Sequence, residues 1–141
     1  MTPSDLKQVL KDHLLWLNSD RKKGKRADLT NANLRNANLT NAYLKNAYLN
    51  NANLSHADLT HAYLDNANLT NANLTNANLN YAYLYKTNLT NTNLEGVKGI
   101  KVYKCHFIEN NERKIKYFLD LQEAKKETSN FLKNKICSWS E

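Results

Sequence analysis

Leucine recurs at every fifth position through the middle of this 141-residue chain, fourteen times in succession from Leu29 to Leu94. Two residues before each leucine stands a small residue, which is alanine in the first twelve copies and threonine in the last two. On an α-helix, five residues advance a side chain by about 500°, so these leucines would point in all directions around the axis. The repeat therefore excludes a helix for residues 27–96.

A continuous strand is excluded as well. Residues two apart share a face of a strand, whereas each alanine lies three residues after the preceding leucine and has the wrong parity. The chain must therefore turn a corner once in every repeat. A path that places one small and one large apolar residue inside and then turns is a coil with short flat sides and a filled centre.

The tandem motif A-[DN]-L-x-x of residues 27–96 resembles the pentapeptide-repeat family. The resemblance implies a mainly β fold, a right-handed quadrilateral β-helix in which four repeats make one coil and the leucines and small residues point inward. The repeats would then form about 3.5 coils stacked as a solenoid. We expect all fourteen leucines to be buried as its core.

Residues 1–26 are predicted to form an N-terminal capping helix followed by a basic loop. Thr2 is the expected N-cap of a helix over residues 3–18, with Pro3 in its first turn and Asp5 completing a capping box. The segment also resembles a leader found in many bacterial members of the family. The apolar face of this helix, which we expect to lie on the first coil, consists of Leu6, Val9, Leu10, Leu14 and Leu17.

Residues 97–141 no longer follow the five-residue rule, and we predict a C-terminal module of a β-hairpin and an α-helix. Residues 100–108 and 113–119 are rich in β-branched and aromatic side chains, which predicts the hairpin, and a helix is predicted over about 121–137. The module either closes the C-terminal end of the coils or pairs with a second chain. The resemblance implies the latter as a homodimer, since related β-helix proteins often dimerise through that end.

Residues twenty apart stack on one another if four repeats make one coil, and this places Tyr43, Tyr63 and Tyr83 in one outward column. Two interpretations are open. The rings pack on one another and protect the backbone, or the column anchors a protein partner, because tyrosine brings a large contact area at a low entropic cost. The candidate partner-binding residues are Tyr43, Tyr48, Tyr63, Tyr81, Tyr83 and Tyr85.

Asparagines fill two further sets of outward positions, and we expect both sets to be structural. Stacked amides can hydrogen-bond up a column, and asparagine tolerates the left-handed backbone that a tight corner requires. We assign these residues no partner-specific role. The two columns are Asn33, Asn53, Asn73 and Asn93, and Asn31, Asn51, Asn71 and Asn91.

The net charge of +7 comes from the two ends of the chain. Residues 1–26 carry seven basic and three acidic side chains and residues 97–141 carry ten and six, whereas the repeats carry three and four. The densest basic cluster is either a solvated loop or a contact for phosphates or an acidic protein, and no nucleic-acid-binding motif accompanies it. It consists of Arg21, Lys22, Lys23, Lys25 and Arg26.

Nothing in the sequence assembles a nucleophile, a general base or a phosphate-binding loop. His56 and His61 flank Asp58, but a five-residue spacing across a corner is not a metal-ligand pattern. Cys105 and Cys137 give neither a disulfide framework nor a zinc pattern. We therefore expect no enzymatic activity, catalytic residue, metal or cofactor. With no apolar run long enough to span a membrane, these features predict a cytoplasmic protein.

The favoured hypothesis is a non-enzymatic protein–protein interaction module, a rigid β-helix that binds an unidentified protein partner through its tyrosines and basic ends. The resemblance offers one alternative, since some family members bind DNA gyrase or related topoisomerases as mimics of duplex DNA. Mimicry needs a long acidic rod, and the nearly neutral repeats disfavour it. The other alternative is binding of nucleic acid or an anionic membrane surface through the basic ends, which predicts a steep salt dependence.

Overall fold

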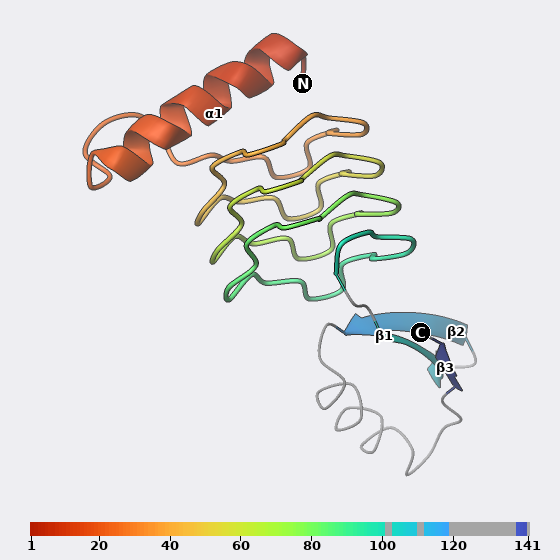
Figure 1. Cartoon of the computed structure of the whole chain (residues 1–141). Helices are drawn as coiled ribbons and strands as arrows, with labels where there is room; N and C mark the ends of the chain where they lie inside the picture. Colours follow the sequence, from red (N-terminus) through yellow and green to blue (C-terminus); the bar gives the residue numbers. More distant parts are fainter. Residues whose placement is uncertain (101–102, 110–111, 119–137, 141) are drawn as a thin grey trace. The chain divides into compact units, whose positions relative to one another are not determined.

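The computed structural model describes residues 1–100, 103–109, 112–118 and 138–140, with side chains described for residues 1–100. The chain divides into two compact units, Met1–Gly99 and Ile100–Glu141. The first unit contains helix α1 (Pro3–Asn18) and the repeats, and the second contains strands β1 (Tyr103–Glu109), β2 (Glu112–Phe118) and β3 (Ser138–Ser140) (Figure 1).

The repeats form coils in which residues twenty apart are joined by parallel β-bridges. The bridges fall into four columns, one on each side of the coil, so the coil is quadrilateral. The N–H of Leu34 donates to the carbonyl of Asn53 at 2.8 Å, and the N–H of Asn53 donates back to the carbonyl of Ala32 at 2.9 Å. The same pair of bonds recurs along the repeats, and Figure 1 shows the resulting coils stacked one on another.

The corners are formed by the second residue after each leucine, which adopts a left-handed backbone with φ between 55° and 66°. Asparagine occupies nine of the thirteen such positions between Asn31 and Asn91. Its short polar side chain can bond locally, which lowers the cost of a conformation that most residues avoid. The predicted role of asparagine at the corners is confirmed.

The asparagines that precede the leucines bond differently from the prediction. The Oδ1 atom of Asn53 accepts hydrogen bonds from the backbone N–H and the hydroxyl of Ser55, at 3.1 and 2.8 Å. Asn33, Asn73 and Asn93 also accept from the N–H group two residues later. These bonds run along the chain and not up the column, so that expectation was wrong. An Asx turn of this kind satisfies a backbone donor just before the next corner.

Twelve of the fourteen repeat leucines are buried, and Leu84 and Leu89 are only half-buried. The expectation of fourteen buried leucines was therefore wrong, and the two exceptions lie on the last coil, which has a coil on one side only. Thr87 and Thr92 replace alanine at the inward position of this coil. Their hydroxyls donate to the carbonyls of Leu64 and Leu69 at 2.9 and 2.8 Å, so each inward polar group has a partner. 

Helix α1 begins as the sequence predicts. Asp5 N–H donates to the Thr2 hydroxyl at 3.2 Å, and Thr2 N–H donates to the Asp5 carboxylate at 2.8 Å. The expected contact face was wrong at one position, since Leu14 is 36% exposed and its neighbour His13 is wholly buried. His13 lies on the same stripe as Leu6, Leu10 and Leu17, which are half-buried, whereas Leu14 points about 100° away from it.

In the second unit, β1 and β2 pair antiparallel from Tyr103–Phe118 to Glu109–Glu112, at the place where the sequence predicts a hairpin. Strand β3 pairs antiparallel with the other edge of β1, which gives the strand order β2-β1-β3. The sequence pattern did not predict this three-residue strand. The predicted helix over about 121–137 lies outside the described residues, and the homodimer through residues 97–141 stays a prediction.

The difference between the central and the last coil gives a test of the core. Leu54, wholly buried in the second coil, should cost about 2–5 kcal/mol of unfolding free energy when replaced by alanine. Leu84→Ala should cost about half as much, because that side chain is already partly in water. Urea denaturation followed by circular dichroism measures both losses. Equal losses would contradict the assignment of Leu84 to an incompletely covered coil.

Candidate functional site

Tyr43, Tyr63 and Tyr83 form a continuous stack on one side of the β-helix, which we call the tyrosine ladder. Successive ring centroids are 4.7 Å apart, and the ring planes differ by only 4° and 3°. The spacing follows from the parallel bridges that join these residues. Because the ring faces cover one another, the ladder presents ring edges and hydroxyls outward, and Tyr43 and Tyr83 are 47% and 50% exposed.

Two more tyrosines widen the ladder at its last coil. Tyr81 is 74% exposed and stacks on His61 at 5.0 Å, and Tyr85 is 68% exposed with the Lys86 ammonium 5.2 Å from its ring centroid. The backbone N–H of Tyr85 donates to the Asp65 carboxylate at 3.1 Å. The structure therefore brings five of the six predicted tyrosines together beside one side of the coils.

Tyr48 lies in the neighbouring column of bridges, between Asp28 and Asn68, and has a different role. The Arg26 guanidinium lies 3.7 Å from the centroid of its ring and donates a hydrogen bond to its hydroxyl at 2.6 Å. Tyr48 is 39% exposed, so it keeps an accessible edge. Its main described contact is nevertheless internal, with the segment that joins α1 to the first repeat.

The basic cluster after α1 is an ordered loop. The Ser19 hydroxyl accepts from the Lys23 N–H at 2.9 Å and lies 3.1 Å from the Lys23 carbonyl, to which it donates. Gly24 adopts a φ of +72°, and an added Cβ there would collide with the Asp12 carbonyl. Arg26 is half-buried against the coil and is therefore partly structural, which the sequence interpretation did not anticipate. The four exposed members are Arg21, Lys22, Lys23 and Lys25.

A groove of about 480 Å³ runs between this end of the helix and the tyrosine ladder. We call it the ladder groove. Sequence analysis missed it, because it depends on where α1 lies on the first coil, and no sequence pattern gives that position. Its lining includes Leu14, Trp16 and Arg21 from the helix and its following loop, and Tyr43, Lys45 and Tyr63 from the coils.

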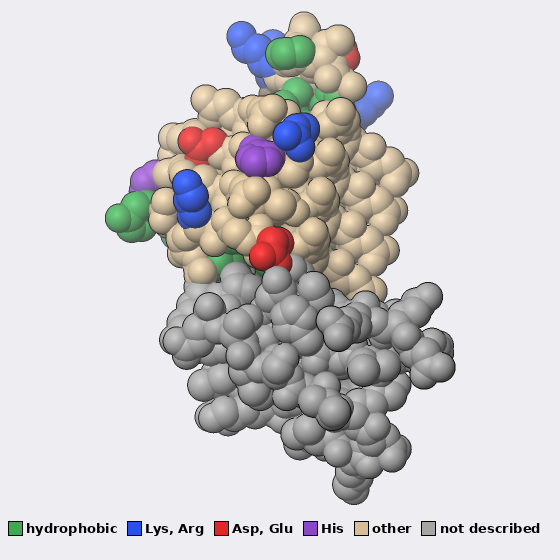
Figure 2. Space-filling model, turned by 90° about the vertical axis from the view of Figure 1, so that its right-hand side faces the viewer, with side chains coloured by type: hydrophobic (Ala, Val, Ile, Leu, Met, Phe, Trp, Pro, Cys, Tyr) green, Lys and Arg blue, Asp and Glu red, His purple; other side chains and the backbone are tan. Residues whose placement is uncertain are grey.

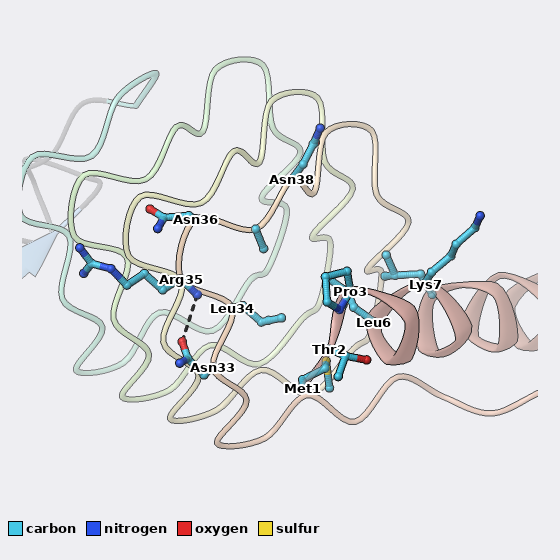
Figure 3. Close-up of a pocket in the computed structure, with 12 residues that line it drawn as sticks. Met1, Thr2, Pro3, Leu6, Lys7, Asn33, Leu34, Arg35, Asn36 and Asn38 are labelled. Carbon is cyan, nitrogen blue, oxygen red and sulfur yellow. Dashed lines mark hydrogen bonds between the residues drawn. The ribbon is translucent and has the colours of Figure 1, made fainter.

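A second groove, of about 500 Å³, lies between the start of α1 and the first coil. Figure 3 shows Pro3 and Leu6 on its helix side and Leu34 on its coil side. The Arg35 side chain extends away from the helix in this view, and its guanidinium donates to the Ser55 hydroxyl at 3.3 Å. Its lining is shared equally between apolar residues and polar ones, among them Lys7 and three asparagines.

Buried His13 fixes the helix on the coil. The Ala27 N–H donates to Nδ1 at 3.0 Å, which requires the proton on Nε2, and Nε2 donates to the Lys45 carbonyl at 3.1 Å. Burial lowers the pKa of His13 from its usual 6.5, the Lys45 carbonyl opposes this shift, and the Arg26 charge adds to it. His13 also stacks on Trp16 at 5.5 Å, so it supports one wall of the ladder groove.

The central tyrosine of the ladder, Tyr63, carries no charge near neutral pH. The pKa of the Tyr63 hydroxyl is raised above its usual 10.0 by the neighbouring Tyr43 phenol, with burial and Tyr83 adding to the shift. Asp58 lies in the neighbouring column of bridges, between Asn38 and Asn78. The Thr60 hydroxyl and N–H bond to Asp58 and lower its pKa, so this carboxylate has local partners.

Within the described residues, no three histidine, cysteine or acidic side chains lie close enough to hold a metal ion. His56 and His61 both occupy left-handed corners, with φ of 59° and 56°. Nor does any helix in that part of the chain combine the length and apolarity needed to cross a membrane.

Comparisons with known proteins identify the family to which this repeat belongs. The family model described as pentapeptide repeats in eight copies matches residues 27–64 and again residues 57–96. A solved pentapeptide repeat protein from Nostoc PCC 7120 is 32% identical, with 67% of this chain and 77% of that chain covered and a TM-score of 0.36. The chain belongs to the pentapeptide repeat family. The right-handed quadrilateral β-helix that the family implies is thus the fold of the repeats.

Two further members of the pentapeptide repeat family have solved structures similar to this chain. HetL, involved in heterocyst differentiation regulation in the cyanobacterium Nostoc sp. strain PCC 7120, is 28% identical over 54% of this chain, with a TM-score of 0.41. Rfr23 from the cyanobacterium Cyanothece 51142 is 42% identical over 55% of this chain, with a TM-score of 0.27. This chain spans only 39% of HetL and 63% of Rfr23. No curated protein matches it.

Pentapeptide repeat proteins are generally non-enzymatic structural or interaction modules. That general property agrees with a candidate site that is an exposed surface with two open grooves.

The lowered pKa of His13 makes the docking of α1 sensitive to acid. Its contribution to stability is complete above the ordinary pKa of about 6.5 and is lost as the pH falls through the lower value of the folded state. Protonation would place a second N–H donor opposite the Ala27 N–H. Urea denaturation between about pH 7.5 and 4.5 should show this loss in the natural chain and in a His56→Gln, His61→Gln control. A His13→Ala variant that kept the same pH dependence would contradict it.

Proposed function

We propose that this protein is a non-enzymatic interaction module that binds a protein partner through a tyrosine face. The tyrosine face consists of the ladder, Tyr43, Tyr63 and Tyr83, together with Tyr48, Tyr81 and Tyr85. The observation that carries the proposal is the exposed stack of parallel rings at 4.7 Å spacing on a hydrogen-bonded scaffold.

Rigidity gives this surface an energetic advantage in binding. A flexible exposed side chain loses rotamer freedom when a partner covers it, which costs about 0.5–1.5 kcal/mol. The ladder rings are already held by their stacked neighbours, so less of that cost falls on association. Tyrosine is also enriched among the residues that dominate binding energy, since its ring is apolar and its hydroxyl can bond at the rim. The five exposed tyrosines are the main aromatic surface of the described side chains.

The charges on the coils argue against mimicry of duplex DNA. Outward acidic residues in the repeats number only four, Asp28, Asp58, Asp65 and Glu95. Three basic residues offset them. On the face shown in Figure 2, charged side chains of both signs are scattered over the described surface and form no acidic band.

The ladder geometry also disfavours binding of single-stranded nucleic acid at the tyrosines. Bases bind such surfaces by stacking on an open aromatic face. In the ladder, both faces of Tyr63 are covered, by Tyr43 and by Tyr83, so a ligand meets ring edges and hydroxyls. Edges and hydroxyls suit a protein surface better than a stack of bases.

The proposal is tested with the ladder variant Tyr43→Ala, Tyr63→Ala, Tyr83→Ala. A partner captured from the native lysate by the natural chain should bind the variant about tenfold more weakly or worse, because three anchors are removed. The inward leucines are untouched, so the variant should fold, which circular dichroism checks. Binding is measured with the purified partner by calorimetry.

The matched control is Asn33→Ala, Asn53→Ala, Asn73→Ala, which truncates the same repeat position on another side of the coil. It removes side-chain hydrogen bonds that the tyrosine variant keeps, so it should be the less stable of the two. Retained binding by this control with loss in the tyrosine variant would support the proposal. Unchanged binding by the tyrosine variant would contradict it.

A further inference from the structure

The ladder groove combines apolar walls with charged side chains, and its lining leads into the basic loop after α1. Leu14 is 36% exposed, Trp16 and Leu17 are half-buried, and Tyr43 completes the apolar surface from the coil side. Leu14 points away from the contact between α1 and the first coil and is therefore exposed. Packing within the described residues does not explain why a large apolar side chain stands at this position. A groove with this lining can take a large apolar side chain.

Two basic side chains line the groove, and three more follow in the loop after α1. Arg21 and Lys45 line it, and Lys22, Lys23 and Lys25 follow Arg21 in the ordered loop. The structure records no ion pair for any of these five within the described residues. Arg21 instead lies 5.3 Å from the centroid of the Trp16 ring. Their charges are thus available to an external anion.

Acidic side chains also line the groove. Asp20 and Asp65 are the two carboxylates in its lining, and Asp65 accepts the backbone N–H of Tyr85 at 3.1 Å. The lining therefore holds two basic and two acidic side chains, and the positive excess comes from Lys22, Lys23 and Lys25, which follow Arg21 in the loop. An interface of this kind favours a partner of opposite charge both in encounter and in the bound state.

We propose that the ladder groove binds an acidic segment of a partner protein, one that carries carboxylates and at least one large apolar side chain. This inference rests on the proposed function and names the chemistry of the partner. The apolar side chain lies between Trp16 and Tyr43, and the carboxylates pair with the Arg21 guanidinium and the Lys45 ammonium. The second groove suits such a segment less well, because the guanidinium of Arg35 extends away from it to Ser55 and its lining offers one other basic side chain, Lys7.

The order of the loop strengthens this assignment. The Ser19 hydroxyl hydrogen-bonds to both the N–H and the carbonyl of Lys23. The Lys25 N–H donates to the Asp12 carbonyl at 3.2 Å, and Gly24 makes the tight turn between Lys23 and Lys25. The cations therefore project from a fixed backbone, so less backbone entropy is lost when an acidic segment binds.

Trp16 provides a readout inside the groove. The chain has two tryptophans, and a Trp139→Phe background leaves Trp16 as the single emitter. The probe is a short peptide in which glutamate alternates with leucine, and the matched probe carries glutamine in place of glutamate. We expect the glutamate peptide to change Trp16 fluorescence with an affinity that falls steeply with salt, and the glutamine peptide to bind about tenfold more weakly or worse.

Two charge reversals locate the site. Arg21→Glu with Lys45→Glu should weaken the glutamate peptide about tenfold or more, since both cations line the groove. The control Lys7→Glu with Arg35→Glu makes the same change in net charge at the other groove and should leave the affinity within about twofold. Equal binding of the two peptides, or equal effects of the two double variants, would overturn the inference. Binding of oligothymidylate in place of the glutamate peptide would overturn it in favour of nucleic acid.

The tyrosine face and the acidic segment can each be overturned without the other. A partner that is lost from the tyrosine variant but bound normally by Arg21→Glu, Lys45→Glu would overturn the acidic segment and leave the tyrosine face standing. The opposite outcome is also possible, in which the glutamate peptide binds the groove but the partner binds the tyrosine variant as tightly as the natural chain. That result would contradict the tyrosine face and support the charge assignment alone.

Discussion

The main-chain hydrogen bonds between coils set the dimensions of everything else in the first unit. The Leu49 N–H donates to the carbonyl of Asn68, nineteen residues later, at 2.8 Å. The Asn68 N–H donates back to the carbonyl of Ala47, two residues before that leucine, at 3.0 Å. This register is held only if the chain turns sharply after every leucine. The left-handed corners make that turn, and asparagine makes it at the least cost. The stacked outward columns follow directly from the register.

Helix α1 supplies a groove wall that the regular coils cannot form by themselves. A repeat produces a flat column on each side, whereas a groove needs a wall that breaks the pattern. His13 places that wall by bonding to the backbone at Ala27 and Lys45. Trp16 then stacks on His13, and Arg21 and Arg26 approach the Trp16 ring at 5.3 and 5.9 Å. Arg21 thus lines the groove beside the ladder because a buried histidine fixes the helix.

Features that recur with the repeat could be predicted from the sequence. Features that depend on how helix α1 is rotated against the coils could not. The five-residue repeat predicts a coil that turns once per repeat. The four-repeat coil implied by the family resemblance then places Tyr43 on Tyr63, twenty residues apart. The exposure of Leu14 and the burial of His13 depend on the rotation of α1 on the coil, which an amphipathic pattern gives only to within about one residue. The same rotation decides where the ladder groove lies, so no sequence signal could have located it.

Photo-crosslinking tests most directly whether the tyrosine side of the coils is the docking surface. A photoreactive amino acid is placed at Tyr81 or at His56, which are both exposed corner residues with a φ of 59°. Tyr81 adjoins the ladder, whereas His56 lies one side of the coil away from it. The account predicts that one partner protein is crosslinked from position 81 in cells and not from position 56. Equal crosslinking from both positions, or crosslinking from position 56 alone, would contradict it.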